Sequence, residues 1–231
     1  MKRGVWQFGF AALCGVAMWS EAALAEVVRR ENPPQVEVAQ SADSQELLRL
    51  FEEGVQFFNQ GTAAGYRQAI SRFEQALELA ERAEVTEGIA YISILLGSSH
   101  NRLGERQAAL RYYQTALEAF REIGDREGEA RTLNNIGAVY NALGDRSEAL
   151  NYFNQALPIR REVGDRAGEA TTLSNIGAVY DALGDRSEAL NFYNQALPIR
   201  REVGDREGEA NTLNNIGAVY NALGDRSEAL N

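Results

Sequence analysis

The sequence repeats itself with a period of forty residues, and this repetition constrains the fold more than any other feature. Residues 130–169 and 170–209 align without a gap and differ at only six positions. A third copy begins at Ala210 and runs to Asn231. Self-similarity at such a period is typical of solenoids, in which each unit buries its apolar face against the next. Such a scaffold builds a binding surface more readily than one asymmetric reaction centre, so the repetition favours a non-catalytic protein.

Each copy predicts two amphipathic helices joined by tight turns. Apolar residues recur every three or four positions across 130–143, and again across 149–163. Between these runs, Gly144 is expected to adopt the left-handed conformation that ends a helix. Asp145 and Glu148 then match the capping pattern of the next helix start. Neither helix buries its apolar face alone, so stacking of neighbouring copies is expected to close the core.

The same spacing continues upstream with lower identity, so the predicted array covers residues 47–231. Its repeats are 47–89, 90–129, 130–169 and 170–209, followed by a partial repeat at 210–231. The first repeat carries extra residues near Thr62–Gly65, which we place in the turn between its helices because turns accept insertions. Residues 26–46 contain two adjacent prolines and scattered charges without a helical period, which predicts a flexible linker.

Residues 1–25 have the pattern of a secretory signal peptide. The positive pair Lys2-Arg3 precedes an uncharged apolar stretch, and the small residues Ala23 and Ala25 stand where a signal peptidase reads. We therefore expect cleavage after Ala25 and an exported protein, periplasmic or extracellular, with no stable membrane span once the signal peptide is removed. The alternative interpretation is an uncleaved membrane anchor, for which the apolar run is short.

The composition excludes several kinds of site. The formal net charge is -10 and no basic cluster is visible, so nucleic acid is not an expected partner. The only cysteine is Cys14, in the leader, and the only histidine is His100, so the usual Cys/His, multi-His metal and Ser/His/Asp arrangements are absent. His100 replaces the tyrosine found at Tyr140, which predicts a packed side chain. We expect no catalytic residue, no metal and no cofactor.

Three aspartates recur with glycine before them, at Asp125, Asp165 and Asp205. This pattern suggests either calcium ligands or helix caps, and caps explain it better because each aspartate stands at a predicted helix start.

Pro158 and Pro198 lie inside the predicted second helices. A proline there removes a hydrogen bond and clashes with the preceding turn. We therefore expect a kink or an early break after Leu157 and Leu197, with the next turn still packed.

The alternation of small and large residues resembles the tetratricopeptide-repeat signature. The residues that carry it are Ile136, Gly137, Tyr140, Gly144, Ala149, Phe153 and Ala156. The usual unit has 34 residues, whereas this forty-residue unit, ending in Arg-Glu-Val-Gly-Asp-Arg at 161–166 and 201–206, is similar to the repeats of the Pins-like (Leu-Gly-Asn) adaptor proteins and the kinesin light chains. The resemblance covers 47–231. It implies an all-α, right-handed superhelical solenoid of antiparallel helix pairs, with the first helix of each unit lining the concave side.

Polar residues on the first helices, offset from the buried stripe, form the candidate peptide-binding groove. They are Arg131, Asn134, Asn135, Asn141, Ser174, Asn175, Asp181, Asn211, Asn214, Asn215 and Asn221. Asparagine costs about 0.5 kcal/mol of helix stability against alanine, but its carboxamide donates to and accepts from an extended backbone. In the Pins-like family, asparagines corresponding to Asn135, Asn175 and Asn215 help hold peptide ligands, so the resemblance points to these three first. The alternative is a solvated surface multiplied by tandem duplication.

The six differences between the two full copies are unevenly placed. They fall at 131/171, 134/174, 141/181, 152/192, 153/193 and 167/207. Three lie on the candidate groove, and two exchange tyrosine with phenylalanine, so the scaffold stayed fixed while the groove changed.

The sequence therefore predicts a non-catalytic protein–protein interaction scaffold that binds an extended peptide or protein segment in its concave groove. The alternative is an N-terminal sensor or adaptor arm of a larger enzyme, such as a repeat protein that continues into a caspase-like (CHAT) peptidase, because the third copy stops within a second helix. The apolar residues Ile216, Tyr220 and Leu230 at this uncapped end also predict self-association.

Overall fold

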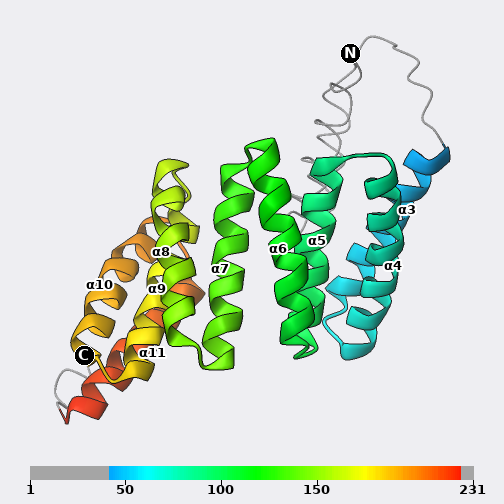
Figure 1. Cartoon of the computed structure of the whole chain (residues 1–231). Helices are drawn as coiled ribbons and strands as arrows, with labels where there is room; N and C mark the ends of the chain where they lie inside the picture. The colour runs from blue at the N-terminus through cyan, green and yellow to red at the C-terminus, as the bar shows by residue number, and fades with distance from the viewer. Residues whose placement is uncertain (1–41, 225–231) are drawn as a thin grey trace. The chain divides into compact units, whose positions relative to one another are not determined.

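The computed structural model describes residues 42–224, and every regular element among them is an α-helix (Figure 1). The chain divides into two compact units, one ending at Ile123 and the other beginning at Gly124. The first unit contains α3 (Ala42–Asn59), α4 (Ala63–Arg82), α5 (Thr86–Arg102) and α6 (Arg106–Ile123). The second contains α7 (Arg126–Leu143), α8 (Arg146–Glu162), α9 (Arg166–Leu183), α10 (Arg186–Glu202) and α11 (Arg206–Leu223). Within each unit, neighbouring helices pack against each other as hairpins, which confirms the predicted all-α repeat solenoid.

Three of the predicted segments lie wholly or partly outside the described residues. The signal peptide at 1–25 lies entirely outside them, as do residues 225–231 at the end of the partial repeat, including Leu230. The linker predicted at 26–46 overlaps the described part only at its end, where α3 already begins at Ala42.

The helix caps determine the residue at which the first helix of each repeat begins. Asp125 Oδ1 accepts a hydrogen bond from Gly128 N at 2.9 Å, and Asp165 and Asp205 accept the equivalent bonds from Gly168 and Gly208 at 2.8 Å. These bonds confirm that the recurrent aspartates are helix caps. Because capping starts each first helix directly after its aspartate, α7, α9 and α11 begin at 126, 166 and 206 rather than at the copy boundaries 130, 170 and 210.

The second helices begin at the predicted aspartate caps, and α7 ends at the predicted glycine. Asp145 Oδ1 accepts from Glu148 N at 3.1 Å, and Asp185 accepts from Glu188 N at 3.1 Å. Gly144 takes a φ of 88° at the end of α7, a left-handed conformation that glycine adopts without steric cost.

Small residues bring the two helices of each pair close together. In the third repeat the Phe153 ring lies directly over Gly137, and a Cβ added to this glycine would stand 2.7 Å from Phe153 Cε1. Ala149 and Ala156 are fully buried beside it. The same packing joins Gly177 to Tyr193.

The first helices are buried on more sides than the apolar pattern predicted. Thr132 and Val139 are fully buried, although neither belongs to the predicted stripe, whereas Leu143 and Val163 at the helix ends are 44% and 39% exposed. The equivalent Val219 of α11 is buried as well, and it packs with Tyr193 of α10, the second helix of the preceding repeat. A first helix is therefore covered by its own partner and by the second helix of the preceding repeat, as α9 is covered by α10 and α8.

The prolines do not interrupt the second helices, so the predicted break after Leu157 and Leu197 is wrong. α8 runs through Pro158 to Glu162, and α10 runs through Pro198 to Glu202. Both prolines are exposed, as is Asn154 one turn before Pro158. Water can therefore reach the carbonyl that loses its hydrogen bond, and the ring lies away from the core.

The extra residues of the first repeat extend a helix rather than a turn, so their predicted place in the turn is also wrong. Residues 60–62 alone separate α3 from α4, and α4 has 20 residues against 18 in α6. Thr62 Oγ1 accepts from Gly65 N at 3.0 Å, so the cap turns residues 63–65 into the first turn of α4.

Candidate functional site

The predicted groove residues share one face of the first helices in the second unit, here named the first-helix face. On α7 and α9 they are half-buried, and on α11 they are exposed. The face comprises Arg131, Asn134, Asn135, Asn141, Ser174, Asn175, Asp181, Asn211, Asn214, Asn215 and Asn221. Because α7 contacts α9 and α9 contacts α11, the three helices place these polar groups on one continuous surface.

One asparagine of this face is a link between repeats. Asn134 Oδ1 on α7 accepts a hydrogen bond from Asn175 Nδ2 on α9 at 3.1 Å, and Thr172 Oγ1 lies 3.3 Å from the same oxygen. The bond fixes the orientation of the Asn175 carboxamide and leaves its Oδ1 and second N–H for other partners. Ser174 instead donates to its own helix at Ala170 O, so the link is not repeated between α9 and α11.

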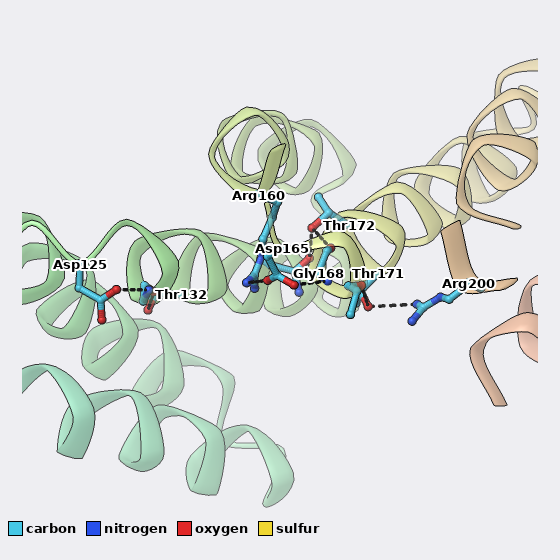
Figure 2. A network of polar contacts seen from close by, with 11 residues as sticks. Asp125, Thr132, Arg160, Asp165, Gly168, Thr171, Thr172 and Arg200 are labelled. Carbon is cyan, nitrogen blue, oxygen red and sulfur yellow. Dashed lines mark hydrogen bonds and ion pairs between the residues drawn. The ribbon is translucent and has the colours of Figure 1, made fainter. Parts of the chain in front are cut away.

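A buried arginine that the sequence patterns did not single out lies beside this face. Arg160 near the end of α8 is 8% exposed and forms an ion pair with Asp165, the residue that caps α9. Burial lowers the pKa of Arg160; the charge of Asp165 opposes this change, and the nearby positive charge of Arg131 adds to it. Figure 2 shows Asp165 between Arg160 and Gly168.

In the next repeat the equivalent arginine has an additional partner. Arg200 is the counterpart of Arg160, and its Nη2 donates to Thr171 Oγ1 at 3.0 Å where the preceding copy has Arg131 (Figure 2). Arg200 also pairs with Asp205. The hydrogen bond from Gly208 N, with Arg200 contributing, lowers the pKa of Asp205 below its ordinary value of 3.8.

Charged residues also tie successive repeats together. Glu169 at the start of α9 is 4% exposed; it accepts from Arg161 Nε of α8 at 2.7 Å and pairs with Arg166. Arg166 Nη2 continues to Glu202 Oε2 of α10 at 2.8 Å, and this bond lowers the pKa of Glu202. These pairs join α9 to the second helices on either side of it, α8 and α10.

His100 is packed and paired within the first unit. Its Nδ1 lies 2.6 Å from Glu105 Oε2, and its ring stacks on Tyr112 with centroids 5.2 Å apart. Tyr140 and Tyr152 make the equivalent stack in the third repeat, so His100 occupies a structural position. Across residues 42–224, no three His, Asp or Glu side chains gather as a metal site would require. No helix in this range has the length and apolar character needed to cross a membrane.

The forty-residue period, the helix caps and the glycine–aromatic packing together define a helical repeat protein. A family model described as a tetratricopeptide repeat matches residues 87–162, 157–202 and 168–231. The chain therefore belongs to the tetratricopeptide-repeat family, whose fold is typically that of a non-catalytic scaffold for protein interactions. No curated protein matches the chain.

Solved structures share the fold at low identity. A kinesin-light-chain protein of Podosopora anserina with nearly identical repeats has a TM-score of 0.65 at 16% identity, covering 80% of this chain and 91% of that one. A Rap protein complexed with competence and sporulation factor has a TM-score of 0.67 at 16% identity, covering 90% of this chain and 56% of its own. A signal transduction ATPase with a tetratricopeptide-repeat sensor, from Pyrococcus horikoshii, has a TM-score of 0.69 at 16% identity, covering 77% of this chain and 28% of its own. The chain thus corresponds to only part of the last two proteins.

Proposed function

We propose that the first-helix face binds an extended segment of another protein, and that the chain acts as a non-catalytic interaction scaffold. The observation that carries the proposal is the set of carboxamides on α7, α9 and α11, of which α9 contacts both of the others, with Asn175 held in place by Asn134 at 3.1 Å. A carboxamide oriented in advance loses little entropy when it bonds to a ligand. Its free oxygen and N–H match the donor and acceptor of a peptide backbone.

The repeat spacing supports an extended ligand. Asn135, Asn175 and Asn215 recur once per repeat on helices that contact one another. A compact ligand would meet one or two of these groups, whereas an extended strand meets them in succession. The Rap protein was solved in complex with a factor, which is consistent with binding by a fold of this kind.

The test is selection of twelve-residue peptides from a displayed random library on the full chain, followed by affinity measurement with fluorescence anisotropy. Replacing Asn135, Asn175 and Asn215 together by alanine should weaken binding of the selected peptides at least tenfold, because each lost backbone hydrogen bond contributes about 0.5–1.5 kcal/mol.

The matched control replaces three exposed asparagines of the second helices, Asn151, Asn154 and Asn194, by alanine. This variant should bind as the unmodified chain does. Equal affinity in all three proteins, or a loss confined to the control, would refute binding at the first-helix face.

A further inference from the structure

Two of the six differences between the copies meet at one place in the fourth repeat. Position 141 is asparagine in the third repeat and Asp181 in the fourth, while Phe153 is replaced by Tyr193. Asp181 lies on α9 and belongs to the first-helix face, whereas Tyr193 projects from α10. The exchange therefore adds a carboxylate and a hydroxyl to the same hairpin.

The ring of Tyr193 lies against α9, the helix that carries Asp181. The Tyr193 side chain is 2% exposed and its ring crosses α9 at Gly177, where an added Cβ would stand 2.8 Å from Tyr193 Cε1. In the first unit the equivalent Tyr113 hydroxyl lies 3.1 Å from Ser98 Oγ. The fourth repeat has Ala178 at that position, and among the described residues nothing hydrogen-bonds the Tyr193 hydroxyl. The Tyr193 hydroxyl therefore keeps its hydrogen-bonding capacity for a ligand or for water.

Asp181 stands one helical turn beyond Gly177 and three residues beyond Ala178, on the same side of α9. Burial raises the pKa of Tyr193 to about 12, and the negative charge of Asp181 contributes to this shift. Asp181 itself is half-buried.

The Asp181 carboxylate does not stabilise α9. Asp181 lies in the last turn of α9, where the helix dipole disfavours negative charge. Arg186 begins α10, and its counterpart Arg146 donates to the main-chain oxygen of Asn141 at 2.7 Å. In the described part of the chain, however, neither an ion pair nor a hydrogen bond joins Asp181 to Arg186 or to another cation.

From this geometry we propose that Asp181 and Tyr193 form a subsite for one basic side chain, a lysine ammonium or an arginine guanidinium, of the segment bound at the first-helix face. The inference rests on the proposed function and makes it specific. The carboxylate supplies the charge and one or two acceptors, and the phenol oxygen accepts a further hydrogen bond from the cation. The third repeat, with Asn141 and Phe153, lacks both groups and does not select a cation.

The sister copy supplies variants that preserve the fold. Asp181→Asn with Tyr193→Phe restores the residues of the third repeat, while Asn141→Asp with Phe153→Tyr installs the subsite there. We expect the library-selected peptides to share one lysine or arginine that binds at this subsite. Changing that residue to glutamine should reduce the affinity for the unmodified chain about tenfold to a hundredfold. The Asp181→Asn/Tyr193→Phe variant should bind the basic peptide and its glutamine form equally well. The Asn141→Asp/Phe153→Tyr variant should in addition prefer a basic residue at a second position of the peptide.

A second measurement does not need a peptide. N-acetylarginine amide, N-acetylcitrulline amide and glycinamide are titrated into the full chain carrying ¹³C-labelled tyrosine, and the Tyr193 ring resonances are followed by NMR. The resonances should shift with the arginine probe and not with neutral citrulline, and the shift should vanish with Asp181→Asn. A response to glycinamide alone would assign the site to a chain terminus and overturn the proposal.

The two proposals fail in different ways. Peptides that bind the first-helix face without any preference for a basic residue would overturn this subsite and leave the scaffold function standing. If no peptide binds, the scaffold proposal fails, and the arginine titration still decides whether the subsite exists.

Discussion

Replacing Asp165 by alanine should lower the free energy of unfolding by about 3–5 kcal/mol, more than any other single change to a cap. Asp165 caps α9 through Gly168 N at 2.8 Å and also pairs with Arg160, which is 8% exposed. Loss of the cap alone costs about 1 kcal/mol. The larger part arises because a buried guanidinium is left without its carboxylate, a loss that typically costs several kcal/mol.

The chain contains a matched control for this prediction. Asp145 caps α8 in the same way, through Glu148 N at 3.1 Å, but it is exposed, and no arginine within residues 42–224 pairs with it. Asp145→Ala should therefore cost only about 1 kcal/mol, and Asp165→Asn, which keeps an acceptor for the cap, should fall between the two alanine variants. Urea unfolding followed by circular dichroism measures all three. Equal losses for Asp165→Ala and Asp145→Ala would show that Arg160 does not depend on Asp165.

Replacing Phe153 by alanine should cost about 3–5 kcal/mol. The ring is fully buried and lies against Gly137, so no side chain on the partner helix can move in to fill the space. Phe153→Tyr is the matched control, since the fourth repeat already holds Tyr193 over Gly177 at the equivalent place. It should change the stability by less than about 1 kcal/mol. A tyrosine variant as unstable as the alanine variant would mean that the two copies are not packed alike.

Much of the fold could be predicted because it is encoded locally and then copied. Asp145 with Glu148 and the left-handed Gly144 act within one turn of the chain, so their pattern is visible in the sequence. Residues whose surroundings come from another repeat were harder to place. Val179 is buried because α9 also packs against α8 of the preceding repeat, and the apolar spacing of a single helix carries no record of that second neighbour.

The prolines show a different limit. Pro158 carries the same chemical penalty wherever it stands in a helix, and the sequence alone favours a break there. Its exposed position on α8 decides the outcome, because the lost hydrogen bond is left to water and not to the core. Exposure at one point of a helix depends on how the neighbouring helices pack.

The candidate site was only partly accessible to sequence reasoning for a related reason. Comparison of the copies drew attention to positions that differ, such as Arg131 and Thr171. The arginines that these residues face, Arg160 and Arg200, are identical in both copies and therefore gave no signal. The upstream repeat has Phe120 where the third repeat has Arg160. An apolar residue at this position indicates a buried site, and Phe120 is indeed fully buried.

The most direct test of the proposed scaffold function is photo-crosslinking of a library-selected peptide from defined positions of the chain. Ala138 and Ala178 each stand one helical turn after a residue of the first-helix face, Asn134 and Ser174, so a photoreactive phenylalanine analogue there lies beside that face. The same analogue at Gln155 or Gln195 lies on the exposed side of the second helices. The peptide should crosslink from Ala138 and Ala178 and not from the two glutamine positions. Crosslinking from Gln155 and Gln195, with none from the first helices, would contradict binding at the first-helix face.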